Sequence, residues 1–215
     1  MSQKDAPRAR SARMTGRERR EQLVAVGRRL FAEKGYDATS VEEIAARAKV
    51  SKPLVYEHFG GKEGLYAVVV DREIATLLAA LEESLKDQRI HPRLLMEQAA
   101  MAFLSYIDEH EDGFRILVRD SPVSQSGGTF SALLTDVARR TEHILVAQFK
   151  LRAYPTRDAP LYAQMLVGMV AYTGQWWLET RSPAKEVVAA RMVNLSWHGL
   201  QALEKKPELG RRPAG

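Results

Sequence analysis

Residues 39–59 read TSVEEIAARAKVSKPLVYEHF, and this stretch decides the fold class. Two helix-start signals divide it. Thr39 stands three residues before Glu42, as in a capping box, and Ser51 shortly precedes Pro53, which costs no hydrogen bond in a first helical turn. The pattern predicts two short helices joined by a tight turn, a helix-turn-helix. The second helix of such a motif fits the major groove of DNA, whereas a helical hairpin with a purely structural role is the alternative.

The charges along the chain favour a polyanion as partner. The sequence has 32 Lys and Arg against 27 Asp and Glu, a formal net charge of +5. Residues 1–60 hold 13 of the basic and 8 of the acidic side chains, so residues 61–215 hold 19 of each and are neutral. A small basic end on a neutral body is typical of nucleic-acid binding, although a solvated basic tail gives the same distribution.

The rest of the sequence predicts helices, with no strand pattern and no internal repeat. Apolar residues recur at helical spacing, and capping residues, glycines or prolines separate the segments. We therefore expect an all-α fold of about nine helices. Besides the two short helices, one helix is expected between Thr15 and Gly35, with a Thr15–Glu18 capping box at its start and Gly35 as a left-handed C-cap. The others are expected at about 62–87, 91–109, 113–119, 129–153, 159–180 and 183–205. Ser182-Pro183 is expected to cap the last of them, and residues 121–128 are expected to form a loop.

Composition changes along the chain divide it into parts. Residues 1–14 lack apolar periodicity, and the helices become long from residue 62 onward. The expected division is a disordered basic arm over 1–14, a helix-turn-helix domain over 15–61, a larger helical domain over 62–205 and a disordered tail over 206–215.

Several classes of protein are excluded by composition. The 215 residues contain no cysteine, which excludes disulfides, thiolate metal sites and a cysteine nucleophile. The first twenty residues have no apolar core of a secretory signal, so we expect a cytoplasmic protein. Residues 161–178 carry no charge, but Gln164, Thr173 and Gln175 dilute their apolar character. Burial between the domain core and a partner subunit suits this segment better than a membrane span, so we expect no membrane partner.

No motif of an enzyme is present. The five histidines are scattered without an HExxH motif, no GxxxxGK[ST] loop occurs, and no paired ExxH motifs are found. The sequence therefore predicts a protein that is not an enzyme, with no catalytic residues, no cofactor and no metal site. A helical interaction protein without DNA affinity stays open as an alternative.

Residues 15–66 resemble the DNA-binding domain of the TetR family of transcriptional regulators. The residues that carry the resemblance are Phe31, Gly35-Tyr36, Thr39, Ile44-Ala45, Val50-Ser51, Tyr56, Phe59 and Lys62-Glu63. One departure is Lys49, which stands in the turn where the family usually has glycine. If this position needs left-handed angles, the side chain costs roughly 1–2 kcal/mol, and its ammonium can contact a phosphate.

The resemblance implies which residues contact DNA. Leu54 could touch a thymine methyl or pack in the core, and His58 could reach a phosphate or cap a helix. The implied set is Thr39, Lys49, Ser51, Lys52, Pro53, Leu54, Tyr56, His58 and Lys62. Arg8, Arg10 and Arg13 could extend this set into a minor groove or remain solvated.

The resemblance also implies a homodimer that binds a palindromic operator in double-stranded DNA. In the family the last two helices form the dimer interface as a four-helix bundle. Here the residues implied for this interface are Leu166, Val170, Trp177, Val188, Met192, Leu195 and Leu203.

The helical body after residue 61 corresponds to the family's ligand-binding and dimerisation domain. Its aromatic and apolar side chains suit a small hydrophobic effector, although ordinary core packing would use the same residues. The candidate ligand-binding residues are Phe103, Tyr106, Phe114, Leu117, Phe130, Leu134, Met165, Met169, Tyr172 and Trp176.

A narrower resemblance concerns the effector. Segments such as SKPLVYEHFGGKEGLYAVVVDREI and DGFRILVRDSP are similar to the actinobacterial fatty acid synthase regulator (FasR-like) branch. This resemblance implies a long-chain acyl-CoA effector and control of fatty acid synthesis genes, with Arg115, Arg119 or Arg181 near the phosphorylated head group. A repressor of a drug efflux gene with an aromatic or cationic effector is the alternative.

Overall fold

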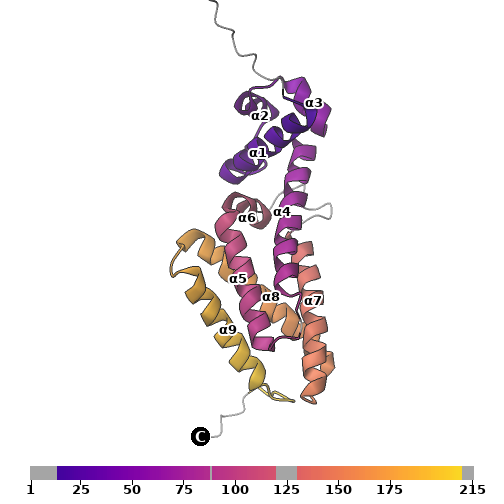
Figure 1. Cartoon of the computed structure of the whole chain (residues 1–215), viewed down its shortest axis with the longest axis vertical. Helices are drawn as coiled ribbons and strands as arrows, with labels where there is room; N and C mark the ends of the chain where they lie inside the picture. The colour runs from indigo at the N-terminus through magenta and orange to yellow at the C-terminus, as the bar shows by residue number, and fades with distance from the viewer. Residues whose placement is uncertain (1–13, 88, 120–129, 210–215) are drawn as a thin grey trace, which may run out of the picture. The chain divides into compact units, whose positions relative to one another are not determined.

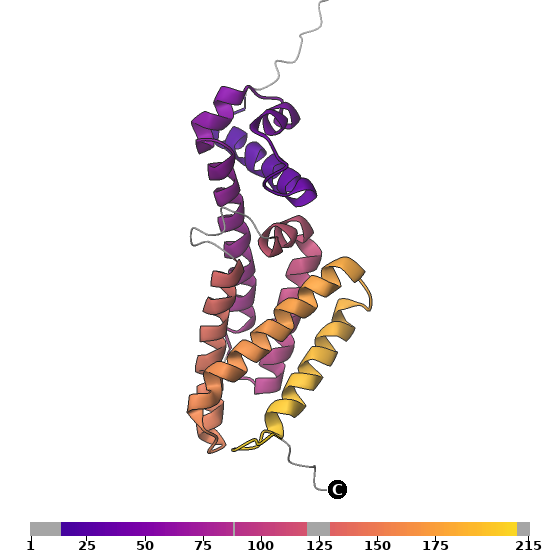
Figure 2. The ribbon, with the colours of Figure 1, turned by 180° about the vertical axis from the view of Figure 1, so that it is seen from behind.

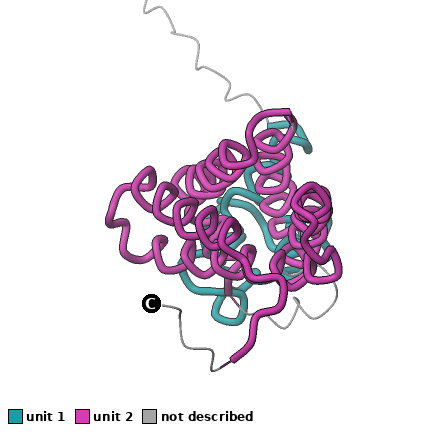
Figure 3. The backbone as a smooth tube through the Cα atoms, turned by 90° about the horizontal axis from the view of Figure 1, so that it is seen from below, with its two compact units in different colours: residues 1–68 teal, residues 69–215 magenta. Residues whose placement is uncertain are grey.

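The computed structural model describes residues 14–87, 89–119 and 130–209, and these residues form nine α-helices, one short 3-10 helix and no strand (Figure 1). The all-α prediction is therefore confirmed. Residues 1–13 of the predicted arm (1–14), the predicted loop at 121–128 and residues 210–215 of the predicted tail (206–215) lie outside the described residues. The chain divides after Val68 into two compact units, which Figure 3 colours separately.

The first unit contains a capped long helix and the two short helices. The predicted capping box of Thr15 and Glu18 is confirmed: the Thr15 N–H donates to the Glu18 carboxylate at 2.7 Å, and the Glu18 N–H donates to Thr15 Oγ1 at 3.2 Å. The helices are α1 (Gly16–Lys34), α2 (Val41–Ala48), α3 (Lys52–Phe59) and the first turns of α4 (Lys62–Ser84).

Two details of the caps differ from the prediction. Gly35 ends α1 with φ 83° and ψ 174°, a glycine-only extended conformation instead of a left-handed helical one. The N-cap of α2 is Ser40, whose Oγ accepts from the Glu43 N–H at 3.1 Å, so the prediction of Thr39 was wrong. Both residues precede a glutamate by three positions, and Thr39 is instead 2% exposed and donates to the Gly35 carbonyl at 2.7 Å.

The core of the first unit comes from the apolar faces of its helices. A Cβ on Gly27 would lie 2.8 Å from Leu65 Cδ2, so the close contact between α1 and the start of α4 requires glycine there. Phe31, Tyr36 and Tyr66 form edge-on ring contacts beside it. The side chains that are almost completely buried are Leu23, Leu30, Phe31, Ile44, Ala48, Val55 and Leu65.

The second unit is a bundle of long helices. α7 packs along α8 and α5 along α9, as Figures 1 and 2 show. A Cβ on Gly174 would lie 2.4 Å from Phe103 Cε1, which indicates a close contact between α8 and α5. The elements are the rest of α4, α5 (Pro92–Glu109), α6 (Glu111–Val118), α7 (Phe130–Leu151), the 3-10 helix η2 (Thr156–Asp158), α8 (Ala159–Thr180) and α9 (Lys185–Gln201).

The last helix begins later than predicted. Its N-cap is Ala184, so the prediction that Ser182 and Pro183 cap it was wrong. The indole of Trp177 donates to the Pro183 carbonyl at 2.8 Å and holds that residue in the connection between α8 and α9. Within the described residues, no helix combines the length and the apolar character that a membrane span needs.

Candidate nucleic-acid interface and ligand cavity

The turn between α2 and α3 is tight and left-handed at one residue. Lys49 has φ 55° and ψ 47°, and its N–H donates to the Ala46 carbonyl at 3.1 Å. The Val50 N–H donates to the Ala45 carbonyl at 2.9 Å and completes the helix end. The Lys49 side chain is exposed, so this position has both the backbone strain and the outward cation that the sequence allowed.

The first turn of α3 presents a polar surface. Ser51, Lys52 and Pro53 are exposed and Tyr56 is 54% exposed, whereas Val55 is completely buried. The Ser51 hydroxyl makes no capping hydrogen bond within α3 and lies at the surface. The amides behind it contribute little, because Pro53 has no N–H and the Leu54 N–H donates to the Ser51 carbonyl at 3.1 Å. A surface hydroxyl with lysine side chains beside it can hold phosphate oxygens.

Lys52 also forms an ion pair across the motif. Its Nζ lies 2.5 Å from Glu42 Oε1 of α2, and the hydrogen bond from Lys52 lowers the pKa of this carboxylate. Both side chains are more than half exposed. Because solvent screens an exposed ion pair, a phosphate can compete with Glu42 for the Lys52 ammonium.

The other candidate DNA contacts lie in different surroundings. Lys62 donates to the Tyr36 carbonyl at 2.9 Å and its Nζ lies 4.1 Å from the centre of the Tyr36 ring, so it holds the α1–α2 connection. Thr39 is buried, and Leu54 and His58 are half-buried. Ser40, which is absent from the set of DNA contacts implied by the sequence, is exposed at the N-terminus of α2. The sequence does contain a signal for it, because Ser40 precedes Glu43 by the same three residues that separate Thr39 from Glu42.

The second unit contains an apolar cavity of about 230 Å³. Of the ten candidate ligand residues, Phe103, Phe130 and Leu134 line it. Tyr106, Phe114 and Leu117 are buried elsewhere in the unit. The lining comes from five helices, with Leu77 and Leu81 of α4, Leu95 and Phe103 of α5, Leu133 and Ile144 of α7, Val167 and Val170 of α8, and Met192 and Trp197 of α9 among its members.

Helix α8 faces the cavity with a different side from the predicted one. Leu166 and Val170, expected at a dimer interface, line the cavity, whereas Met165, Tyr172 and Trp176, expected as ligand residues, are 48–76% exposed. The reason is that α8 is apolar all round, so periodicity does not select the inner side. The remaining ligand candidate, Met169, is half-buried outside the cavity lining. Among the remaining interface candidates, Met192 lines the cavity, Trp177 and Val188 are buried, and Leu203 packs against the cluster that contains Phe149. Leu195 is 66% exposed.

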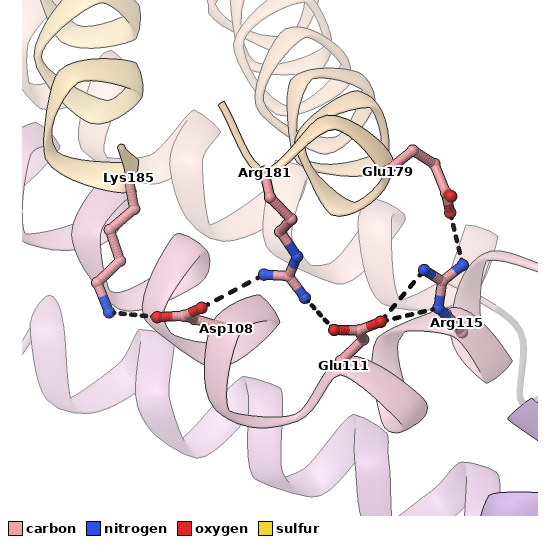
Figure 4. Close-up of polar contacts among 6 residues, drawn as sticks. All are labelled: Asp108, Glu111, Arg115, Glu179, Arg181 and Lys185. Atoms are coloured by element: carbon pink, nitrogen blue, oxygen red, sulfur yellow. Dashed lines mark hydrogen bonds and ion pairs between the residues drawn. The ribbon is translucent and has the colours of Figure 1, made fainter. Parts of the chain in front are cut away.

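An ion-pair chain joins the α8–α9 connection to the α5–α6 junction (Figure 4). Lys185 Nζ lies 2.8 Å from Asp108, whose second oxygen lies 3.4 Å from Arg181. Arg181 reaches Glu111 at 2.6 Å, and Glu111 lies 3.2 Å from Arg115, which also contacts Glu179 at 2.6 Å.

These ion pairs engage two of the three arginines that were expected near the head group of an effector. Arg115 and Arg181 each pair with two carboxylates, and neither they nor Arg119 line the cavity. Among the described residues, no three His, Asp or Glu side chains come together as a metal site would require.

A helix-turn-helix with an exposed second helix, followed by a larger helical unit that contains an apolar cavity, is typical of DNA-binding transcriptional regulators. Family models agree with this class in both units. The model described as "Bacterial regulatory proteins, tetR family" matches residues 23–69, and "Tetracyclin repressor-like, C-terminal domain" matches residues 92–199. The chain belongs to the TetR family of bacterial transcriptional regulators, which are DNA-binding proteins and not enzymes.

Individual relatives cover different parts of the chain. The HTH-type transcriptional activator FasR of Mycolicibacterium smegmatis is 30% identical over 199 residues, 89% of this chain and 87% of that protein. The HTH-type transcriptional repressor BdcR of Escherichia coli is 34% identical over 91 residues, 41% of this chain and 46% of that protein. The crystal structure of a TetR-like transcriptional regulator from Rhodococcus sp. RHA1 superposes with a TM-score of 0.73 at 25% identity, covering 89% of this chain and all of that one.

Proposed function

We propose that this TetR-family regulator binds a palindromic operator as a homodimer and responds to a long-chain acyl-CoA, through which it controls fatty acid synthesis genes. The observation that carries the effector part is the apolar cavity inside the second unit, which suits an acyl chain and offers few polar groups to a polar molecule. The similarity to FasR over 89% of the chain supports the same assignment.

The operator contacts that we propose lie around the α2–α3 turn. Lys49, Ser51 and Lys52 bind phosphates on either side of the groove, and Tyr56 donates from the exposed side of α3. Pro53 and half-buried Leu54 lie on the same turn, where Leu54 can contact a thymine methyl. Ser40 replaces Thr39 as the proposed phosphate ligand at the start of α2, because its hydroxyl is at the surface.

The proposed dimer forms through the outer faces of α8 and α9. Leu161, Met165, Tyr172 and Trp176 are exposed at successive spacings of four, seven and four residues and so share one side of α8. Leu195 is exposed on α9. Apolar side chains arranged in this way on two neighbouring helices are typical of a surface that a second copy covers.

A charge in this face tests the dimer. Tyr172→Lys places an ammonium among the apolar side chains, and we expect light scattering to report the mass of one chain at concentrations where the unaltered protein has the mass of two. Leu151→Lys is the matched control, because Leu151 is 81% exposed and belongs to α7 instead of α8 or α9. A Tyr172→Lys protein that stays dimeric would contradict the proposed interface.

Helix α4 provides a route from the cavity to the DNA-binding unit. Leu65 near its start is buried in the first unit, and Leu77 and Leu81 further along line the cavity. A ligand that displaces these side chains favours a dimer geometry in which the two α3 helices no longer match successive major grooves. A coupling free energy of about 1–3 kcal/mol changes operator affinity several-fold or more.

The test is a titration of a complex between the protein and its own promoter fragment, followed by fluorescence anisotropy. Palmitoyl-CoA and oleoyl-CoA are expected to change the affinity at least several-fold. Coenzyme A alone and an aromatic cation such as tetraphenylphosphonium are expected to leave it unchanged. A response to the aromatic cation alone would favour an efflux repressor. No response to any acyl-CoA would refute the lipid effector and leave the DNA-binding function intact.

A further inference from the structure

An open groove of about 760 Å³ adjoins the apolar cavity of the second unit. The two share side chains of α4, α5 and α7, so the groove is continuous with the cavity instead of being a separate surface depression. The shared residues include Glu82, Leu85, Leu95, Arg140, Ile144 and Gln148. We infer that this groove is the entrance to the cavity.

The side chains change character from the cavity to the entrance. Inside, Leu77, Leu133 and Val167 are typical of an apolar lining. The entrance adds Arg139 and His143, one turn apart on α7, to the shared Arg140. A site that is apolar within and basic at its opening is complementary to an amphiphile with an acidic head group.

An ion pair lies where the cavity meets the groove. Arg140 Nη1 of α7 donates to Glu82 Oε1 of α4, two helices that lie side by side in Figures 1 and 2, and both side chains are about half exposed. Arg139 lies 3.4 Å from Asp136 on its own helix. Exposed pairs of this kind contribute only about 0–1 kcal/mol, so an incoming anion can exchange with either carboxylate at small cost.

We propose that Arg140, with Arg139 and His143, binds the acidic head group of the effector at this entrance, and that Glu82 is an internal competitor which the head group displaces. This inference rests on the proposed amphipathic effector and assigns where its charged end is recognised. In this proposal the head group binds on α7 beside α4, and the arginines that pair with Asp108 and Glu111 have a structural role.

Competition between Glu82 and the ligand gives variants with opposite effects. Arg140→Gln removes the cation and should weaken palmitoyl-CoA binding about five-fold, whereas Glu82→Gln frees Arg140 and should strengthen it by a similar factor. Arg140→Lys keeps the charge and should recover part of the affinity. Arg157→Gln is the matched control, because Arg157 is 81% exposed and does not line the cavity or the groove.

The experiment is isothermal titration of the full-length protein with palmitoyl-CoA, palmitate and hexadecanol, which share a chain length and differ in head group. Hexadecanol should bind all variants equally. Weakening of both acids by Arg140→Gln supports a site for any oxyanion, and weakening of palmitoyl-CoA alone supports a site for its phosphates. Shifts of the same sign in Arg140→Gln and Glu82→Gln, or equal shifts with hexadecanol, would overturn the inference alone, whereas no binding of any amphiphile to the unaltered protein would overturn the proposed effector with it.

Discussion

Replacing Lys49 with glycine separates the two contributions of the α2–α3 turn, backbone strain and surface charge. At φ 55° and ψ 47° a residue with a Cβ costs roughly 1–2 kcal/mol. Glycine removes this cost but loses about 0.4–1 kcal/mol through its greater freedom in the unfolded chain. We therefore expect Lys49→Gly to raise the free energy of unfolding by roughly 0.8 kcal/mol, the midpoint of a difference that spans about 0–1.6 kcal/mol.

Lys49→Ala is the matched control, because it removes the ammonium and keeps the strain. Urea unfolding followed by circular dichroism should give a higher midpoint for Lys49→Gly than for Lys49→Ala. Both variants should bind promoter DNA equally weakly, since both lose the same phosphate contact in each subunit. A glycine variant no more stable than the alanine variant would refute the argument from strain, and unchanged DNA affinity in both would refute the phosphate contact.

Two further predictions concern the second unit. Gly174→Ala should destabilise the protein by about 1–3 kcal/mol, because the added Cβ would lie 2.4 Å from Phe103. Gly16→Ala is the control, since a Cβ there meets open space and should not destabilise the protein. Thermal unfolding compares the two variants, and equal melting temperatures would contradict the close packing at Gly174. The hydrogen bond from Lys185 lowers the pKa of Asp108 below 3.8, so this pair stabilises the fold above pH 3.8 and the contribution is lost as the pH falls through the lowered pKa. Lys185→Met should therefore unfold at lower urea than the unaltered protein at pH 7, with the difference shrinking below pH 3.8, and a difference that is constant with pH would argue against the linkage.

The DNA-binding motif could be predicted from sequence because its signals are local. Capping residues, a proline in the first turn and a short apolar pattern each act within a few residues, and the structure places α2 and α3 within residues 39–59 accordingly. The error at Thr39 and Ser40 has the same origin, since both residues satisfy the capping pattern and only tertiary burial of Thr39 selects between them.

The cavity could not be predicted residue by residue. Helix α8 is apolar on every side, so only its contacts with α5 and α7 decide that Leu166 faces inward and Met165 outward. The basic entrance was missed for a related reason. Arg139, Arg140 and His143 resemble a solvated helix face in the sequence, and nothing local indicates that Glu82, 58 residues earlier, lies against them.

The exposed start of α3 in each subunit of the dimer is proposed to bind phosphates of the DNA. The salt dependence of promoter binding tests this contact most directly. The affinity of the unaltered protein and of Lys52→Gln is measured by fluorescence anisotropy across a series of salt concentrations. We predict a steep linear fall of log affinity with log salt concentration, and a slope about 2 smaller in magnitude for Lys52→Gln, one lost phosphate contact in each subunit. A slope that is flat, or the same in both proteins, would contradict the claim.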